Sequence, residues 1–345
     1  MDLTIAAILG LDGLTNGAIY ALVALALVLV FSVTRVIFIP QGEFVAFGAL
    51  TLAALQLGKV PGTVWLLLIL AVAATVLDLI QGLRERWAAP RLLGKLLATL
   101  GFPLVASGVT FWLAPQHPPL IVQVALTLAV VTAMGPLLYR LAYRALSGAS
   151  VLTLLIVSVG VHFALTGIGL VFFGAEGYRT PAFWDARFDV GPLSLTGQTL
   201  IIFGASIALL IAMFVFFERT LTGKALRATS VNRTGARLMG ISGDAAGSLS
   251  FTLAAFIGAL SGLLISPSTT IYYDTGFLIG LKGFVAAVFA GLASFPMALG
   301  GAIGVGLIES FGSFYASAFK EVIVFTVILP ILLWRSFVDP HHEEH

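Results

Sequence analysis

The chain has 345 residues, of which 59% are hydrophobic and only 10% charged, and its mean hydropathy is +1.07. Soluble globular domains carry about 25% charged residues, so this composition excludes a soluble protein and indicates an integral membrane protein. The apolar runs are continuous rather than alternating, which excludes a membrane β-barrel. The absence of cysteine excludes disulfides and thiolate metal sites. Because the first ten residues contain Asp2 and no Lys or Arg, we expect no cleavable signal peptide.

Eleven apolar runs follow one another along the chain, each of about the length needed to cross lipid or somewhat less, given roughly 20 residues per crossing. They lie at about 11–31, 36–57, 63–81, 92–113, 119–139, 150–174, 197–217, 247–266, 278–294, 297–312 and 321–335. We therefore predict an all-α, polytopic transmembrane bundle that forms a single domain over residues 1–345. An odd number of crossings places the two termini on opposite sides of the membrane.

The positions of the basic residues predict the orientation, because Lys and Arg near helix ends are retained in the cytoplasm. With the amino terminus outside and the carboxyl terminus inside, 13 of the 18 Lys and Arg residues, Arg335 among them, fall on the cytoplasmic side. The largest outside loop, 175–196, mixes aromatic and acidic residues. This mixture is typical of an ordinary interfacial loop, and it would also suit contact with an external partner.

A basic stretch at 223–241, inside the predicted cytoplasmic loop 218–246, is the longest run that cannot be buried in lipid. It carries four basic residues and no acid, together with small residues that would let another surface approach its backbone. Retention of positive charge in the cytoplasm explains the sign of this stretch but not its small residues, so we interpret it as a docking segment. We expect Asn232 to cap a short helical turn and Asp244 to cap the next membrane helix.

Motifs for catalysis are missing. The run Gly223-Lys224-Ala225 lacks the hydroxyl residue and the upstream glycine that a phosphate-binding loop requires. The zinc-protease and serine-hydrolase motifs are also absent, and three of the five histidines lie in the tail 341–345, which we interpret as a solvated terminus. We predict that the chain is not an enzyme, binds no ATP, and needs no cofactor or metal.

Polar residues inside the apolar runs are candidates for a translocation path, because an ionisable group there costs about 2.5–3.5 kcal/mol and tends to face a cavity or a partner. These candidates are Asn16, Gln41, Glu43 and Glu309. Glu43 follows Pro40, a break that could expose the start of the helix to water, but an interfacial carboxylate at a helix start fits equally well. For Glu309 the rival interpretation is a buried pair with a basic group, and Asn16 could face a pore or a neighbouring helix.

Other polar and small residues are given structural interpretations. His162 is interpreted as a hydrogen-bonded packing residue, and Lys282 is expected near the outer interface, where its long stem can reach water. Glycines spaced four residues apart predict close helix packing in lipid. These pairs are Gly13 with Gly17, Gly258 with Gly262, and Gly300 with Gly304.

Three motifs together resemble one known family. Residues 223–228, with Asn232, Ala236 and residues 238–241, are similar to the cytoplasmic loop of branched-chain amino acid ABC-importer permeases of the shorter-chain type. Residues 280–294, 300–301, 306–309 and 324–325 resemble the carboxyl-terminal pattern of that family, and residues 41–44 with Gly48 resemble its second-helix motif. The resemblance covers 11–57 and 137–335. Phe38 and Pro40 depart from the family pattern, and region 82–118 is predicted to hold an extra pair of helices.

The resemblance implies a permease of the bacterial inner membrane that imports branched-chain amino acids or related small polar solutes by ATP-driven alternating access. It implies three kinds of partner besides lipid and solute: a second homologous permease, two cytoplasmic ATP-binding subunits and a periplasmic solute-binding protein, with no nucleic acid. The implied ATPase-coupling residues are Gly223, Lys224, Leu226, Arg227, Asn232, Ala236, Arg237 and Gly240. The alternative is a passive channel or an ion-coupled carrier in which Glu43 and Glu309 bind the coupling ion.

Overall fold

A computed structural model describes residues 3–86, 88–191, 193–292, 294–327 and 329–333. These residues form thirteen α-helices and one two-stranded antiparallel hairpin. Eight of the helices are long and apolar enough to cross a membrane, and a ninth, shorter helix is also apolar. The predicted polytopic helical bundle is therefore confirmed. Arg335 and the tail 341–345 lie outside the described residues.

All helices except α8 and α9, which lie in the basic stretch, follow the predicted apolar runs in order. Their bounds are α1 Leu3–Thr34, α2 Gln41–Gln56, α3 Gly62–Arg84, α4 Ala89–Leu113, α5 Leu120–Leu138, α6 Val151–Phe173, α7 Gly197–Arg219, α8 Leu221–Val231, α9 Arg233–Leu238, α10 Gly243–Ile265, α11 Thr275–Phe289, α12 Phe295–Tyr315 and α13 Lys320–Thr326. The strands are β1 Arg187–Val190 and β2 Leu193–Thr196. Helices α2, α11 and α13 are shorter than a full crossing, so the count of eleven crossings stays a prediction.

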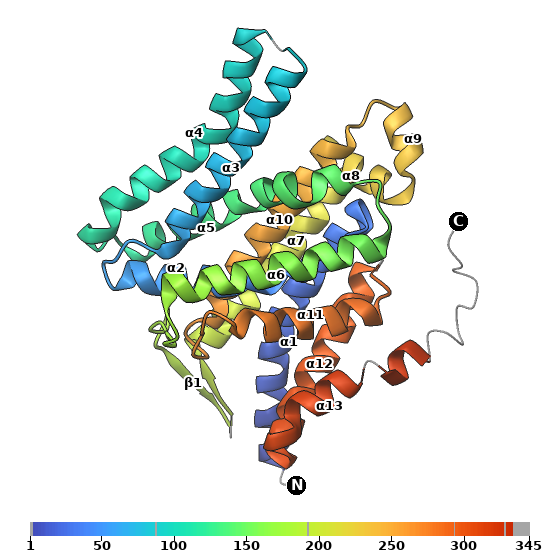
Figure 1. Cartoon of the computed structure of the whole chain (residues 1–345). Helices are drawn as coiled ribbons and strands as arrows, with labels where there is room; N and C mark the ends of the chain where they lie inside the picture. The colour runs from blue at the N-terminus through green and yellow to red at the C-terminus, as the bar shows by residue number, and fades with distance from the viewer. Residues whose placement is uncertain (1–2, 87, 192, 293, 328, 334–345) are drawn as a thin grey trace.

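Helix α1 forms the centre of the bundle. It is apolar on all sides, which is typical of a buried helix, and its residues from Ile19 to Val30 are all buried. It contacts α7, α8, α10, α11 and α12 (Figure 1). Where α1 crosses α12, a Cβ added at Gly306 would lie 2.2 Å from the Gly13 carbonyl oxygen and 2.7 Å from the Gly17 Cα. The predicted packing role of Gly13 and Gly17 is confirmed.

Helix α2 is held between α10 and α11 by similar backbone contacts. A Cβ at Gly262 of α10 would lie 2.0 Å from the Val45 carbonyl oxygen, and Gly258 packs against Phe44, which confirms the second predicted glycine pair. The third pair is wrong, since a Cβ at Gly300 or Gly304 would meet no atom within 4 Å. These two residues lie on the open side of α12, because each residue along a helix turns about 100° and the packed face carries other glycines.

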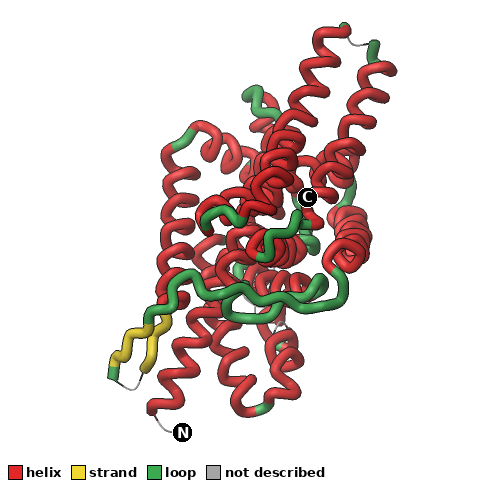
Figure 2. The backbone as a smooth tube through the Cα atoms, turned by 90° about the vertical axis from the view of Figure 1, so that its left-hand side faces the viewer, coloured by secondary structure: helices red, strands yellow, loops and turns green. Residues whose placement is uncertain are grey.

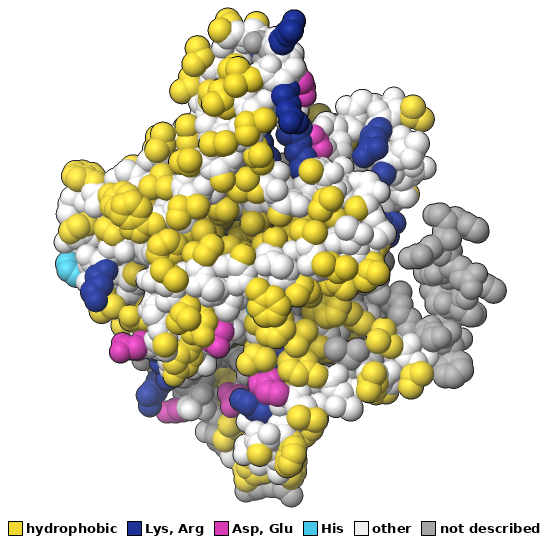
Figure 3. Space-filling model, in the orientation of Figure 1, with side chains coloured by type: hydrophobic (Ala, Val, Ile, Leu, Met, Phe, Trp, Pro, Cys, Tyr) yellow, Lys and Arg dark blue, Asp and Glu magenta, His cyan; other side chains and the backbone are white. Residues whose placement is uncertain are grey.

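The two ends of the bundle differ. Figure 1 shows α9 and the turn between α3 and α4 at one end, and the β-hairpin and the start of α1 at the other; Figure 2 gives the same separation from the side. In Figure 3 an apolar band crosses the middle of the visible face; basic side chains lie near α9 and the α3–α4 turn, and others lie beside acidic ones toward the hairpin end. The basic stretch and the loop 175–196 thus lie at opposite ends, as predicted.

Region 82–118 and the loop 175–196 both contain secondary structure. Region 82–118 contains the end of α3, the whole of α4 and a short 3-10 turn, and its status as an addition to the family pattern stays a prediction. The hairpin in loop 175–196 was not predicted, although both of its four-residue strands alternate polar and apolar residues, the pattern that indicates a half-buried strand.

We expect Gly306→Val to destabilise the bundle strongly and Gly304→Val to be tolerated. The first substitution forces side-chain atoms into the α1 backbone, and overpacking of this kind costs about 1–3 kcal/mol or more, whereas the second faces open space. Both variants change glycine to valine in the same helix, so the effect of helix propensity on stability is the same in both and cancels when they are compared. Thermal unfolding of the two purified proteins in detergent measures the difference, and equal midpoints would contradict the α1–α12 contact.

Candidate functional site: a charged vestibule and a docking surface

A cavity of about 930 Å³, here called the vestibule, lies between α1, α11, α12 and the segment around the β-hairpin. Its lining includes a series of polar and charged residues: Asp12, Asn16, Tyr20, Arg179, Asp185, Arg187, Lys282, Glu309, Lys320 and Glu321. Of the four predicted path residues, the structure brings Asn16 and Glu309 together here. Gln41 and Glu43 do not line this cavity.

Glu309 and Lys282 form a buried ion pair at the vestibule wall. The Lys282 ammonium donates to Glu309 Oε1 at 2.6 Å and to Glu321 Oε1 at 3.1 Å, and the Tyr20 hydroxyl donates to Glu309 Oε2 at 2.5 Å. Lys282 is 5% exposed and Glu309 8% exposed. The pairing of Glu309 with a basic group is therefore found. The expected interfacial position of Lys282 is wrong, because α11 is short and two carboxylates meet the ammonium inside the bundle.

Gln41 and Glu43 lie in a separate, packed region at the start of α2. Glu43 Oε1 is 2.6 Å from His162 Nδ1 on α6, and the Gln41 amide donates to the Ala254 carbonyl at 3.0 Å. The His162 ring also stacks on Phe277 of α11. The role of His162 as a hydrogen-bonded packing residue is confirmed. Sequence reasoning missed its partner, although both residues are isolated ionisable groups in apolar runs and so each needs one.

The predicted coupling segment folds into α8 and α9, and three side chains cap the helices around it. Thr220 Oγ1 accepts from the Gly223 amide at 3.0 Å at the start of α8, and Asn232 Oδ1 accepts from the Gly235 amide at 2.8 Å at the start of α9. The predicted cap by Asn232 is confirmed. Asp244 is not a cap, since Ser242 takes that place in α10, while Asp244 in the first turn accepts from Arg144 Nε at 2.9 Å.

One face of this segment packs on the bundle. Gly223, Leu226 and Ala236 are buried, and a Cβ at Gly223 would lie 2.1 Å from the Phe216 carbonyl oxygen. The Arg233 guanidinium donates to the Val33 carbonyl at the end of α1, at 2.5 Å. Burial lowers the pKa of Arg233, and the positive charges of Arg35 and Arg237 lower it further. Arg233 thus joins the segment directly to the central helix.

The other face is open and has a mixed apolar and basic character; we call it the docking surface. Its apolar residues are between 81% and 87% exposed and comprise Leu221, Val231, Leu238 and Met239. The exposed Lys224, Arg227 and Arg237 lie on the same two helices, and Arg227 forms an ion pair with Glu218. Gly240 follows α9 with a φ of +82°, a left-handed conformation that favours glycine. Exposed apolar groups rimmed by charge are typical of a protein interface.

Residues 96–332 match the family model described as the permease component of branched-chain amino acid transport systems. The chain belongs to this family. It is 25% identical to the high-affinity branched-chain amino acid permease BraD of Pseudomonas aeruginosa, over 94% of the chain and 92% of BraD. It is 27% identical to LivH of Escherichia coli K12, over 60% of the chain and 69% of LivH. No solved structure is significantly similar.

Membership in the family makes the protein a permease component of a branched-chain amino acid ABC transport system and not an enzyme. It is a multi-pass membrane protein, and its bacterial homologues are permeases of the inner membrane. The match also includes most of the residues that form the docking surface and the vestibule. The docking surface therefore lies within the matched part of the chain, whereas the vestibule residues from α1, such as Asn16 and Tyr20, lie outside it.

We expect Lys282→Met in the permease to lower its stability by about 3–5 kcal/mol, since removal of the ammonium leaves the buried Glu309 and the partly exposed Glu321 without their cation. The double variant Lys282→Met with Glu309→Gln should recover part of the loss, because only Glu321 then lacks its cation. Thermal unfolding in detergent of the parent protein, both single variants and the double variant checks this. A double variant as unstable as the sum of its single variants would contradict the pairing.

Proposed function

We propose that the permease forms half of a transmembrane pathway for branched-chain amino acids or related small polar solutes, driven by ATP hydrolysis in other subunits. The proposed complex contains a second homologous permease, two cytoplasmic ATP-binding subunits and a periplasmic solute-binding protein. The observation that carries the proposal is the arrangement of the two sites. An exposed docking surface lies at one end of the bundle, a charged vestibule opens toward the other, and α1 contacts both.

The proposed orientation places the amino terminus and the hairpin in the periplasm, and the docking surface and the carboxyl terminus in the cytoplasm, with eleven membrane segments. The basic side chains at the α9 end support this orientation, because Lys and Arg near helix ends are retained inside. The vestibule then faces the solute-binding protein. Its mouth carries both acidic and basic side chains, which suits a solute that bears an ammonium and a carboxylate.

The proposed mechanism couples the two ends mechanically. An ATP-binding subunit docks on α8 and α9, and its movement reaches α1 through the Arg233 to Val33 hydrogen bond and the buried Leu226. Asn16 and Tyr20 of the same helix line the vestibule. A rocking movement of α1 therefore changes the vestibule, as alternating access requires.

The four candidate path residues fall into two pairs, one that lines the vestibule and one that is packed between helices. Asn16 and Glu309 line the vestibule and are proposed to face the solute on its way through. Gln41 and Glu43 are packed between α6, α10 and α11, so we propose a path role for them only in a state in which these helices separate.

We expect Arg227→Glu to reduce ATP-driven uptake roughly tenfold in vesicles that contain the complete transporter, as loss of one significant interface residue costs about 1–2 kcal/mol. Because Arg227 also pairs with Glu218, the double variant Glu218→Arg with Arg227→Glu rebuilds that internal pair with the charges exchanged. Uptake should stay low in this double variant. Full recovery would show that Arg227 serves only the internal pair. Lys59→Glu, at an exposed position after α2 that lines neither the docking surface nor the vestibule, is the control for a change of charge alone.

The alternative, a passive channel or an ion-coupled carrier, is tested by the same vesicles prepared without the ATP-binding subunits. Our proposal predicts no solute flux through the permease alone, and flux under these conditions would contradict it. The solute class is tested separately by thermal stabilisation of the cognate binding protein with amino acids, amides and urea.

A further inference from the structure

Helix α4 is separated from α10 by a groove that the transport proposal does not use. The cavity in this groove measures about 750 Å³, within the range of about 300–1,000 Å³ typical of ligand sites. Its apolar lining comes from α4 and α5: Ala98, Phe102, Pro103, Ala133, Pro136 and Leu137. The main contacts of α4 are with α3 and α5. The groove is thus open on the side where α4 would otherwise meet α10.

Basic residues surround the end of this groove that lies toward the α3–α4 turn. The groove and two adjoining cavities, of about 480 Å³ each, share Arg144 and are lined by five basic and three acidic residues. The basic ones are Arg84, Arg91, Lys95, Arg140 and Arg144. This end of the bundle also carries the docking surface (Figure 1), so in the proposed orientation it lies at the cytoplasmic membrane boundary.

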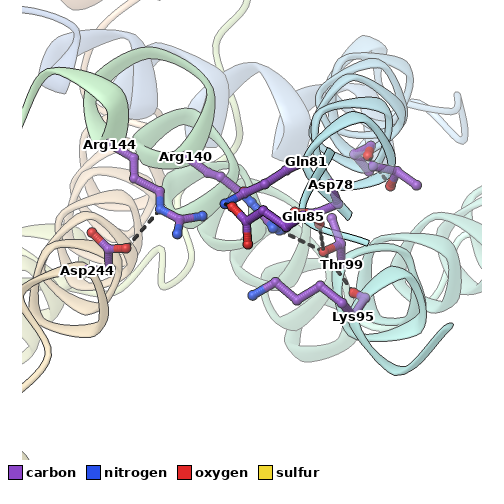
Figure 4. Close-up of polar contacts among 10 residues, drawn as sticks. Asp78, Gln81, Glu85, Lys95, Thr99, Arg140, Arg144 and Asp244 are labelled. Carbon is purple, nitrogen blue, oxygen red and sulfur yellow. Dashed lines mark hydrogen bonds and ion pairs between the residues drawn. The ribbon is translucent and has the colours of Figure 1, made fainter. Parts of the chain in front are cut away.

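Two of these arginines are held in position by neighbouring acids (Figure 4). Arg140 forms an ion pair with Asp78, which is 1% exposed, and donates to Thr99 Oγ1 at 2.8 Å. Thr99 in turn donates to Asp78 Oδ2 at 2.8 Å. Arg144 donates through Nε to Asp244. The charge of Asp78 is therefore neutralised by Arg140. Because the guanidinium groups of Arg140 and Arg144 are already held in place, binding an anion costs little of their side-chain entropy.

Lys95 differs from these arginines. Its side chain extends into the space between α4 and Arg144 (Figure 4), and it lines both the groove and one adjoining cavity. Its ammonium makes no hydrogen bond or ion pair with any residue that the structure describes. A cation that faces an apolar groove beside a fixed arginine is placed to take an anionic group whose remainder is apolar.

We propose that this groove binds one anionic phospholipid, with its phosphate between Lys95 and Arg144 and an acyl chain along the apolar lining. Basic pockets between membrane helices at the cytoplasmic boundary attract anionic lipid headgroups. A lipid fits better than free phosphate because the larger part of the groove is apolar. It also fits better than a soluble protein, because α4 exposes the large apolar residues Leu93, Leu97 and Trp112. The bound lipid would join the α3–α4 pair to α10.

The first test measures lipid retained by the full permease purified in detergent, using native mass spectrometry with phosphatidylglycerol and phosphatidylcholine. We expect the parent protein to retain phosphatidylglycerol preferentially, and Lys95→Ala to reduce this retention roughly fivefold, the factor that corresponds to ~1 kcal/mol per basic residue. Lys59→Ala removes the same charge from an exposed lysine beyond the end of α2 and should have no effect. Because the Lys95 ammonium makes no hydrogen bond or ion pair with any described residue, its removal should leave the lipid-free unfolding temperature unchanged.

The second test fills the groove without a change of charge. Ala98→Trp places a large side chain into the groove, whereas Leu97→Trp, on the next position of α4, replaces a side chain that is 70% exposed. We expect the first variant to lose phosphatidylglycerol and the second to retain it. The pair separates occupation of the groove from the general effect of a tryptophan in α4.

Several results would overturn the proposal. Equal losses in the Lys95 and Lys59 variants would indicate diffuse attraction to the whole surface, and equal retention of both lipids would indicate nonselective solvation. Displacement by millimolar inorganic phosphate alone would indicate a small-anion site. If the second permease covered the groove in the assembled transporter, the groove would be a subunit interface and not a lipid site.

Discussion

The structure depends on the close approach of α1 to its neighbours through glycine. In lipid there is no hydrophobic drive between helices, so contact area and polar bonds must hold them together. Gly13, Gly17 and Gly306 let α1 and α12 meet backbone to backbone, and Gly42, Gly262 and Gly276 do the same around α2. In the proposed mechanism, this closely packed centre allows α1 to carry a displacement from one end of the permease to the other.

Buried ionisable groups are the second constraint, because each must find a partner inside the bundle. In the described residues these groups are paired in three clusters, each of which joins different elements. The clusters are Lys282 with Glu309 and Glu321, Glu43 with His162, and Asp78 with Arg140. The first lines the vestibule, the second fixes the start of α2, and the third holds α3 and α4 to the turn that follows α5. The aromatic contacts of Phe38 with Phe44 and Phe251 strengthen the packing near α2 where the sequence departs from the family pattern.

Much of the fold follows from local patterns, because lipid imposes a simple rule on them. Continuous apolar runs predict the helices, and the cap at Asn232 needs only residues that are neighbours in the chain. The errors are of another kind. Lys282, Asp244 and the pair Gly300 and Gly304 were misplaced because their surroundings come from distant segments: Lys282 meets Glu309 and Glu321, Asp244 meets Arg144, and Gly301 and Gly306 carry the contacts of α12.

The sequence by itself determined the class of protein, the positions of the helices and the candidate docking segment, since each depends on composition or short-range spacing. Only the tertiary structure decided which polar residues share a cavity. It placed Asn16 beside Glu309, buried Glu43 against His162, and opened a basic groove between α4 and α10. The physical reason is that these neighbours are brought together by helix crossing and rotation, which many distant contacts set jointly and no local pattern encodes.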